Sequence, residues 1–233
     1  MGKEIEKISL ERGHQIISIC DPYAGEAFDL EKLKLADIAI EYSVPSVVHE
    51  NILKCFGVAV PVVVGTTGWY QQLPDIIEAC EKFKATIFYS PNYSIGVNIF
   101  FRINEMLAKL MKDQPDYEVK LNEVHHTKKK DAPSGTTIKL ADIILSTLER
   151  KKSWVCNEKG NEIELNADTI PITYSREDDV VGFHEVDYLS SSDKITLVHE
   201  AYSRKGFAVG TLVASEWLIG RKGVFTMHDL LQY

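Results

Sequence analysis

Short apolar runs alternate with amphipathic stretches over the first part of the chain. The run VPVVVG at 60–65 is β-branched and continuous, as expected for a parallel strand buried on both faces. Apolar positions three and four residues apart predict helices between such runs. The predicted elements are helices at 2–12, at 45–56 and around Ile76, Ile77 and Cys80, and strands at 15–20, 37–42, 60–65 and 86–90. This alternation predicts a doubly wound α/β layer.

The pattern changes after Pro91. Helices are predicted at 95–112 and 135–149, and period-two alternation predicts strands at 117–126, 172–177, 181–190 and 194–203. We therefore expect a second, α+β domain with a mostly antiparallel sheet that is open on one face, and such a face is suited to contact between subunits. The apolar segment 206–220 predicts a helix that returns to the first domain.

Composition narrows the class of protein. Of the 233 residues, 45% are apolar and 26% are charged, which is typical of a globular chain and not of a disordered one. The net charge of −8 argues against a nucleic-acid partner. No apolar run has the length of a membrane span, and the N-terminus lacks the apolar region of a signal peptide. Four cysteines without a CxxC pair indicate reduced thiols, so we expect a cytoplasmic protein.

Two polar loops follow predicted parallel strands. Gly65-Thr66-Thr67-Gly68 comes directly after the strand at 60–65, and Ser90-Pro91-Asn92-Tyr93 follows the strand at 86–90. Glycine lets a backbone approach a ligand closely, and ligands of open α/β sheets bind beyond the carboxyl ends of the strands. The pair of loops favours a ligand in this crevice, although the first loop alone is equally compatible with a tight turn.

Asp21 is a candidate ribose acceptor at the end of the strand predicted at 15–20. In dinucleotide-binding units an acidic residue lies roughly 20 positions after the glycine loop, and Asp21 lies 19 positions after Gly2. The spacing applies if Met1-Gly2 is the end of a glycine motif. An equally good interpretation is that Asp21-Pro22 is only a turn.

The strongest chemical signal is the segment from Glu123 to Thr136. It gathers two histidines and three lysines within six residues, at 125–130, before a Ser-Gly-Thr helix start. The backbone N–H groups of Gly135 and Thr136 are natural anion receptors, and a group with a pKa near neutrality could move a proton beside them. We expect no metal, because adjacent histidines of a strand point to opposite faces. Lys128 and Lys130 are interpreted as solvated, and Ser134 as a helix N-cap.

The residues HHTKKKDAPSGT resemble the signature of the 4-hydroxy-tetrahydrodipicolinate reductases, a histidine pair followed by lysine and DAPSGT. GTTG at 65–68 and PNYSIGVN at 91–98 are similar to two further blocks of that family, in the same order. The C-terminal WLIGRKGVFTMHDLL also resembles the end of the family's sequences. The resemblance therefore spans essentially the whole chain.

The resemblance implies an enzyme that reduces the cyclic intermediate formed by loss of water from 4-hydroxy-tetrahydrodipicolinate, with hydride from NADH or NADPH, toward diaminopimelate and lysine. It implies a Rossmann-type dinucleotide-binding domain at 1–93 with 204–233, a domain for substrate binding and oligomerisation at 94–203, and a homotetramer. His125 and Lys129 are the implied catalytic residues, with His126, Gly135 and Thr136 binding the dicarboxylate substrate. The implied cofactor contacts are Gly65, Thr66, Thr67, Ser90, Pro91, Asn92 and Tyr93.

The chain departs from the family pattern at its start. The family's first strand and glycine loop would precede Met1, so we expect weak cofactor binding and keep a non-catalytic remnant as an alternative. Another nicotinamide oxidoreductase of similar layout, such as an amino-acid dehydrogenase, is a further alternative. Pro22 stands where some relatives place an arginine that could meet a 2′-phosphate. Because Asp21 would repel that phosphate, we expect NADH to be preferred over NADPH.

Overall fold

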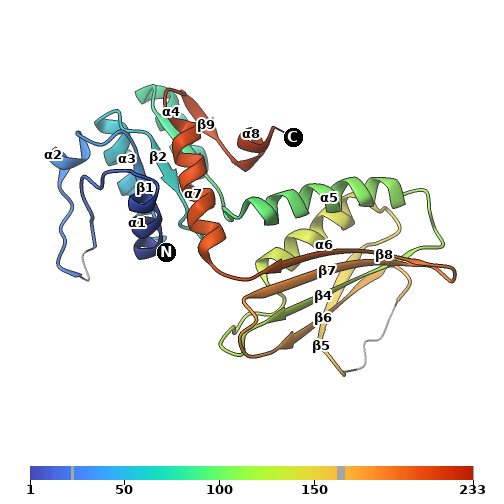
Figure 1. The fold of residues 1–233 in the computed structure, drawn as a ribbon. Helices are drawn as coiled ribbons and strands as arrows, with labels where there is room; N and C mark the ends of the chain where they lie inside the picture. The colour runs from blue at the N-terminus through green and yellow to red at the C-terminus, as the bar shows by residue number, and fades with distance from the viewer. Residues whose placement is uncertain (22–23, 162–165, 233) are drawn as a thin grey trace. The chain divides into compact units, whose positions relative to one another are not determined.

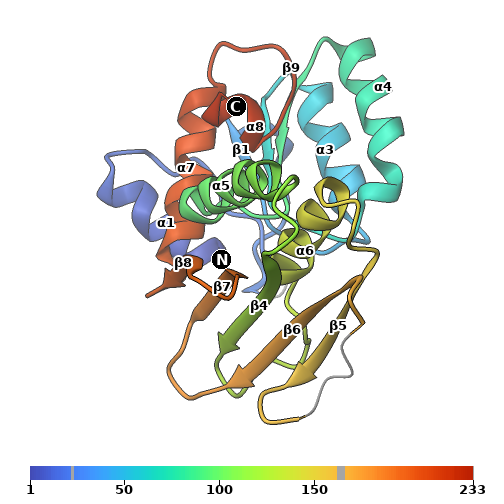
Figure 2. The same cartoon turned by 90° about the vertical axis from the view of Figure 1, so that its right-hand side faces the viewer.

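The computed structural model describes residues 1–21, 24–161 and 166–232 (Figures 1 and 2). The chain divides into two compact units, one formed by Met1–Ile95 with Lys205–Tyr233 and the other by Gly96–Arg204. Each unit contains its own sheet. Within the described part of the chain, no helix combines the length and apolar character needed to cross a membrane.

The first unit is an α/β layer around a parallel sheet of order β1-β2-β3-β9. Its strands are β1 (Ala39–Glu41), β2 (Val62–Val64), β3 (Thr86–Tyr89) and β9 (Gly223–Phe225). Its helices are α1 (Gly2–Glu11), α2 (Leu30–Leu33), α3 (Val48–Gly57), α4 (Leu73–Phe83), α7 (Lys205–Leu218) and α8 (Met227–Leu231). A short 3-10 turn, η2 (Tyr70–Gln72), precedes α4.

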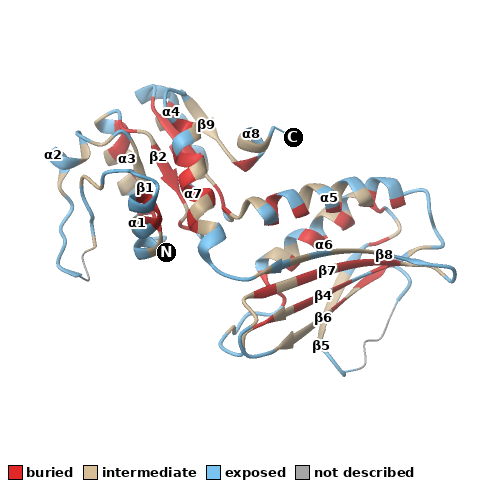
Figure 3. Cartoon of the chain, viewed as in Figure 1, coloured by how far each residue is buried: buried red, intermediate tan, exposed pale blue. Residues whose placement is uncertain are grey.

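The continuous apolar run of β2 is explained by burial on both faces of the sheet, as Figure 3 shows for this strand. Val62 and Val64 join the core formed with α3 and α4, whereas Val63 joins the core formed with α7. Successive residues of a strand point to opposite faces, so helices on both faces require apolar residues at every position. The predicted doubly wound layer is confirmed.

The strand predicted at 15–20 is wrong. The chain leaves α1 at Gly13, which has a φ of +84°, and residues 14–20 run without regular secondary structure. Asp21 then makes an isolated antiparallel bridge with Glu26. A strand requires a partner for its backbone hydrogen bonds, and in the described residues β1 pairs only with β2. An apolar run alone does not supply that partner.

The second unit has a five-stranded sheet of order β5-β6-β4-β7-β8. Its strands are β4 (Glu118–His125), β5 (Ser153–Glu158), β6 (Thr169–Arg176), β7 (Gly182–Leu189) and β8 (Lys194–Ala201). The helix α6 (Gly135–Thr147) and the long helix α5 (Ile95–Met111), which begins at the unit boundary, pack one face of this sheet through a core that includes Phe100, Leu140 and Leu121. In the described part of this unit, no helix covers the opposite face (Figure 3). Glu118 and Lys120 of β4 alternate with buried residues and are exposed.

The expectation of a mostly antiparallel second sheet is wrong. β4 pairs with β6, and β6 with β5, in parallel, while β4–β7 and β7–β8 are antiparallel. The chain passes through α6 after β4, and a helical crossover allows the following strands to run in the same direction as the strand before it. β5 and β9 were not predicted from the sequence, because one follows a helix without clear alternation and the other has only three residues.

Candidate active site

Two functional side chains lie on the helix-covered face of β4. Along this strand the residues alternate, so that Val119, Leu121, Glu123 and His125 are buried. Glu123 is 0% exposed and His125, the last residue of the strand, is 7% exposed. The loop 126–134 then leads into α6, whose N-cap is Ser134. The sequence therefore places a buried imidazole and a helix N-terminus at the two ends of one short loop.

The Glu123 carboxylate joins the strand to this helix. Oε2 accepts hydrogen bonds from the backbone N–H of Ser134 at 2.9 Å and from Thr137 Oγ1 at 2.6 Å. Oε1 lies 3.4 Å from Arg176 Nη2 and 3.8 Å from His125 Nδ1. Burial by itself raises the pKa of Glu123, but its hydrogen bonds with Ser134 and Thr137, helped by the charge of His125 when that ring is protonated, leave the pKa below its usual value. The carboxylate is thus ionised inside the unit.

His125 lies beside a second buried histidine. Its ring meets that of His184 on β7 edge to face, with centroids 5.0 Å apart, and His184 Nε2 lies 3.2 Å from Ser134 Oγ. Burial lowers the pKa of both imidazoles, that of His184 to about 3. The charges of Lys129 and Arg176 lower the pKa of His125 further, and Glu123 opposes them. Both rings are therefore neutral near pH 7.

Arg176 on β6 holds the loop that follows β4 in place. Arg176, which is paired with His125 in the sheet register, donates hydrogen bonds to the carbonyl oxygens of Asp131 at 2.7 Å and Lys129 at 3.3 Å. Lys129 Nζ forms an ion pair with Asp131 at 2.6 Å, which lowers the pKa of that aspartate. These contacts keep Lys129 next to the strand end, whereas Lys128 and Lys130 are exposed.

The remaining predicted substrate residues flank the same loop. His126 is half-buried, and its Nε2 lies 3.5 Å from Arg204 Nη2. Gly135 is exposed and Thr136 half-buried in the first turn of α6, where backbone N–H groups have no acceptor within the helix. Ser134 caps this helix as predicted, because its side chain accepts a hydrogen bond from the N–H of Thr137. The structure thus gathers the cations Lys129, Arg176 and Arg204 and three imidazoles around the N-terminus of α6.

Three of these side chains also have the ligand types of a metal site. In the described residues, ligand atoms of Glu123, His125 and His184 lie within 4.8 Å of one another. The Glu123 carboxylate, however, already accepts three hydrogen bonds, one of them from Arg176, so the group is arranged as a hydrogen-bonding network. The expected absence of a metal stays a prediction.

The two loops predicted to contact a cofactor lie side by side in the first unit. The N–H of Ser90 donates to the carbonyl of Val64 at 3.3 Å, so the loops after β2 and β3 share one edge of the sheet. Thr67 and Pro91 are exposed there, and Gly68 has a φ of +81°. The carbonyl oxygen of Asn92 accepts a hydrogen bond from Ser90 Oγ at 2.7 Å.

Other members of these loops have internal partners. Thr66 is buried and donates from Oγ1 to Glu41 Oε2 at 2.6 Å. Tyr93 is buried and donates to the carbonyl of Val64 at 2.8 Å. Gly65 packs against the ring of Tyr42. These three residues therefore support this edge of the sheet through contacts inside the first unit.

Asp21 lies in a turn rather than at a strand end. Its backbone N–H donates to the carbonyl of Glu26 at 2.9 Å, and its own carbonyl accepts from the N–H groups of Ala24 and Glu26. Pro22 lies outside the described residues. This geometry matches the interpretation of Asp21 as part of a turn. It also brings Glu26, which carries a second carboxylate, opposite Asp21.

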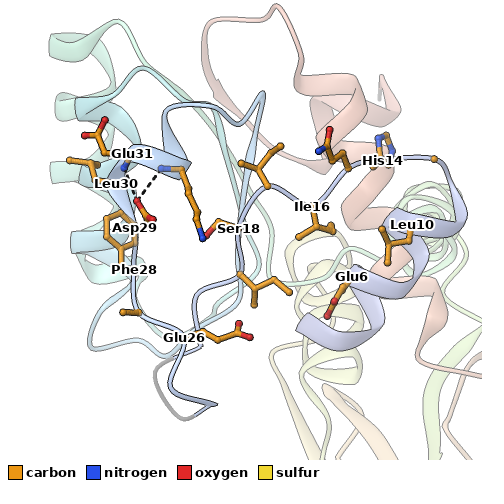
Figure 4. Close-up of a pocket in the computed structure, with 16 residues that line it drawn as sticks. Glu6, Leu10, His14, Ile16, Ser18, Glu26, Phe28, Asp29, Leu30 and Glu31 are labelled. Atoms are coloured by element: carbon orange, nitrogen blue, oxygen red, sulfur yellow. Dashed lines mark hydrogen bonds between the residues drawn. The ribbon is translucent and has the colours of Figure 1, made fainter.

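A broad hollow of about 1080 Å³ also belongs to the first unit (Figure 4). It lies between α1, residues 13–19 and residues 26–32, and its lining mixes apolar side chains such as Leu10 and Phe28 with the carboxylates of Glu6 and Glu26. Among the residues that the structure describes, none of those predicted to contact a cofactor lines this hollow.

Sequence reasoning missed the residues that organise the site. Glu123, Arg176 and His184 come from three different strands, and they meet because Glu123 pairs with His184 and His125 with Arg176 in the sheet register. Such pairings are not local in the sequence. For Glu123 a signal existed, because the period of two along β4 places it on the same face as His125.

Comparison with known proteins agrees with this arrangement. The family model described as "Dihydrodipicolinate reductase, N-terminus" matches residues 1–93, and "Dihydrodipicolinate reductase, C-terminus" matches residues 96–231. The chain belongs to the dihydrodipicolinate reductase family. The resemblance in the basic loop and the glycine-threonine loop is therefore confirmed as a family relationship.

Relatives in this family cover most of the chain. It is 44% identical to the 4-hydroxy-tetrahydrodipicolinate reductase of Christiangramia forsetii, over 99% of this chain and 93% of that protein. It is 40% identical to the reductase of the same name from Aquifex aeolicus, over 86% of this chain and 75% of that protein. The comparisons give no support to the alternative of a truncated, non-catalytic remnant.

Solved structures share the fold of the dihydrodipicolinate reductase family. The dipicolinate-bound dihydrodipicolinate reductase from Paenisporosarcina sp. TG-14 superposes with a TM-score of 0.69 at 24% identity, over 86% of this chain and 76% of that one. An amine dehydrogenase from Mycobacterium smegmatis superposes with a TM-score of 0.57 at 10% identity, over 96% of this chain and 91% of that one. The Rossmann-type unit with a second α+β unit is thus confirmed as the fold class.

Proposed function

We propose that this chain reduces 4-hydroxy-tetrahydrodipicolinate, by way of dihydrodipicolinate, to tetrahydrodipicolinate with a nicotinamide cofactor, in diaminopimelate and lysine biosynthesis. The observation that carries the proposal is the 44% identity with a reductase of that name over nearly the whole of both chains. The buried His125, the neighbouring Lys129 and the helix N-terminus at Gly135 supply matching chemistry.

The dicarboxylate substrate would bind at the loop 126–134 and the start of α6. Backbone N–H groups at Gly135 and Thr136 suit one carboxylate, because a helix N-terminus carries partial positive charge. His126 and Lys129 add hydrogen-bond donors for the rest of the substrate. Arg176 fixes the backbone of this loop, so these donors are held in place before the substrate arrives.

His125 and Lys129 would protonate the ring carbon next to the reduced position. Burial keeps His125 neutral near pH 7 in the free chain. Two substrate carboxylates beside it would favour its charged form and raise its pKa, so His125 would take up a proton as substrate binds. Lys129 is the second proton donor in this proposal.

The cofactor would bind at the edge formed by Thr67, Gly68 and Pro91, where exposed backbone and a hydroxyl lie beyond the carboxyl ends of two parallel strands. When bound, it supplies the hydride. Asp21, with Glu26 nearby in the same turn, would repel a 2′-phosphate, so NADH would be preferred. An Asp21→Ser variant that leaves the NADH to NADPH ratio of kcat/KM unchanged would contradict this preference.

A homotetramer is proposed through the uncovered face of the second sheet. In the described part of the second unit no helix covers this face, on which Val198 of β8 is exposed, and an uncovered sheet face is suited to contact between subunits. We also propose that the protein acts in the cytoplasm, where its four free cysteines would stay reduced. Light scattering measures the assembly: a monomer at micromolar concentration would contradict the tetramer.

The proposed activity is tested by coupling the chain to the preceding synthase, with pyruvate and aspartate semialdehyde as the starting materials. Loss of NADH absorbance is expected only when the synthase and both starting materials are present. Absence of NADH oxidation by correctly folded chain would contradict the proposed function.

A further inference from the structure

Glu123 is an ionised carboxylate without solvent contact, and such a group must be matched by partners inside the protein. It is 0% exposed, and its pKa lies below the usual value despite burial. A buried charge costs several kcal/mol unless hydrogen bonds and opposite charges compensate it. Its neighbours should therefore indicate why the second unit keeps a charge at this position.

The two oxygens of Glu123 serve two different structures. Oε2 accepts hydrogen bonds from the N–H of Ser134 and the hydroxyl of Thr137, both in the first turn of α6. Oε1 accepts a hydrogen bond from Arg176 Nη2 at 3.4 Å and faces His125 Nδ1 at 3.8 Å. That ring nitrogen is buried and has no hydrogen-bond partner within the described residues, and Glu123 Oε1 is the carboxylate oxygen that faces it.

We propose that Glu123 is a positioning residue, which sets the His125 imidazole and the first turn of α6 with a single carboxylate. The distance between the His125 ring, as proton donor, and the N-terminus of α6, as receptor for a substrate carboxylate, is then fixed. A proton on His125 Nδ1 also has an acceptor. The inference rests on the proposed function, since it takes His125 as the proton donor. It adds a role for a residue that does not contact the reacting atoms.

Other charged groups around Glu123 and His125 also affect how readily His125 takes up a proton. Facing them are Arg176 from β6, His184 from β7, Lys129 and Asp131 from the loop, and the Cys156 thiol from β5. Lys129 and Arg176 disfavour a proton on His125, whereas Glu123 and Asp131 favour it. Glu123 is the larger of these two favourable contributions, so removing its charge makes His125 harder to protonate.

The Glu123→Gln variant keeps the shape of the side chain and removes its charge. Because a proton donor must be protonated, activity falls as pH rises through the pKa of His125 in the substrate complex. In the variant this fall should occur at a pH about one unit lower, with a decrease of about tenfold in kcat at pH 7.5. A merely structural role would leave the position of this limb unchanged.

Three further variants separate the contacts of Oε1 from those of Oε2 and serve as controls. Thr137→Val removes a donor to Oε2 and the hydroxyl contact with Ser134 Oγ, both at the start of α6, so KM should rise while the pH limb stays in place. Glu177→Gln removes an exposed carboxylate near the same strand ends and should change neither quantity. Glu123→Asp retains the charge on a shorter side chain and should restore part of the pH limb, and it replaces Glu123→Gln if that variant fails to fold.

An NMR titration of the His125 ring gives a readout that does not depend on turnover. We expect its pKa to fall in Glu123→Gln and to recover partly in Glu123→Asp. If His125 titrates identically in all three proteins, the positioning role is overturned even when the enzyme is active. If the pKa moves as expected but the unmodified chain does not oxidise NADH, the proposed function fails while the link between Glu123 and His125 stands.

Discussion

Gly65 packs directly against the ring of Tyr42. A Cβ added to this glycine would lie 2.1 Å from Tyr42 Cζ, and the Tyr42 hydroxyl lies 2.7 Å from Thr211 Oγ1 on α7. The first glycine of the GTTG loop is therefore required by packing inside the first unit.

This packing predicts that Gly65→Ala destabilises the chain without any ligand. The methyl group must displace Tyr42 and its hydrogen bond to Thr211, which should lower the free energy of unfolding by about 1–3 kcal/mol. Gly57→Ala is the control, because no atom lies within 4 Å of the Cβ position there. Urea unfolding of both variants measures the difference, and equal stability of the two would contradict the steric explanation.

Ser134→Ala should lower stability by about 1–2 kcal/mol, because it removes the N-cap of α6 and leaves His184 Nε2 without its hydroxyl neighbour. The exposed Ser146 in the same helix, which donates only to the carbonyl of Ile143, gives a matched Ser146→Ala control with a change within about 0.5 kcal/mol. A loss no larger than that of the control would mean that the cap does not stabilise the helix.

The buried histidines predict a loss of stability in mild acid. Burial lowers the folded-state pKa of His184 to about 3, so below the ordinary value of 6.5 the unfolded chain binds a proton that the folded chain does not. The free energy of unfolding should therefore fall as pH decreases from about 6.5 toward 3, by up to about 1.4 kcal/mol per pH unit for this group. In His184→Gln the slope between pH 6.5 and 4.5 should be smaller, and an unchanged slope would be inconsistent with a buried neutral ring.

Substitutions of Lys129 and Lys128 are expected to have very different effects on kcat, although the two residues are adjacent. Lys129→Ala should reduce kcat by about a hundredfold or more, because it removes a proposed proton donor. Lys128 is exposed, so Lys128→Ala should leave kcat within about twofold. Steady-state kinetics with the synthase-coupled assay compares them, and similar losses in both variants would assign the effect to the general charge of the loop.

Local patterns were sufficient for most of the helices and for the chemistry of one loop. His125, Lys129 and Gly135 lie close together in the sequence, so their meeting around residues 126–134 could be predicted. The run at 60–65 predicted a strand buried on both faces, and β2 is such a strand. At these places the packing depends on residues that are close together in the sequence, so the local pattern was sufficient to predict it.

The errors concern partners that are distant along the chain. Residues 15–20 have the apolar character of a strand, but they form no ladder in the described structure, and strand formation depends on one. β6 pairs in parallel with both β4 and β5, and composition does not reveal these pairings. Arg176 and His184 reach His125 only through the register of three strands, so no spacing in the sequence could place them there.

The most direct test of the proposed function follows hydride itself from cofactor to product. The chain is supplied with NADH that carries deuterium at the transferred position, together with substrate made in situ by the preceding synthase, and the product is analysed by mass spectrometry. We expect tetrahydrodipicolinate with a single deuterium, formed at a rate that falls about a hundredfold or more in His125→Ala. Unlabelled product, or no product from folded chain, would contradict it.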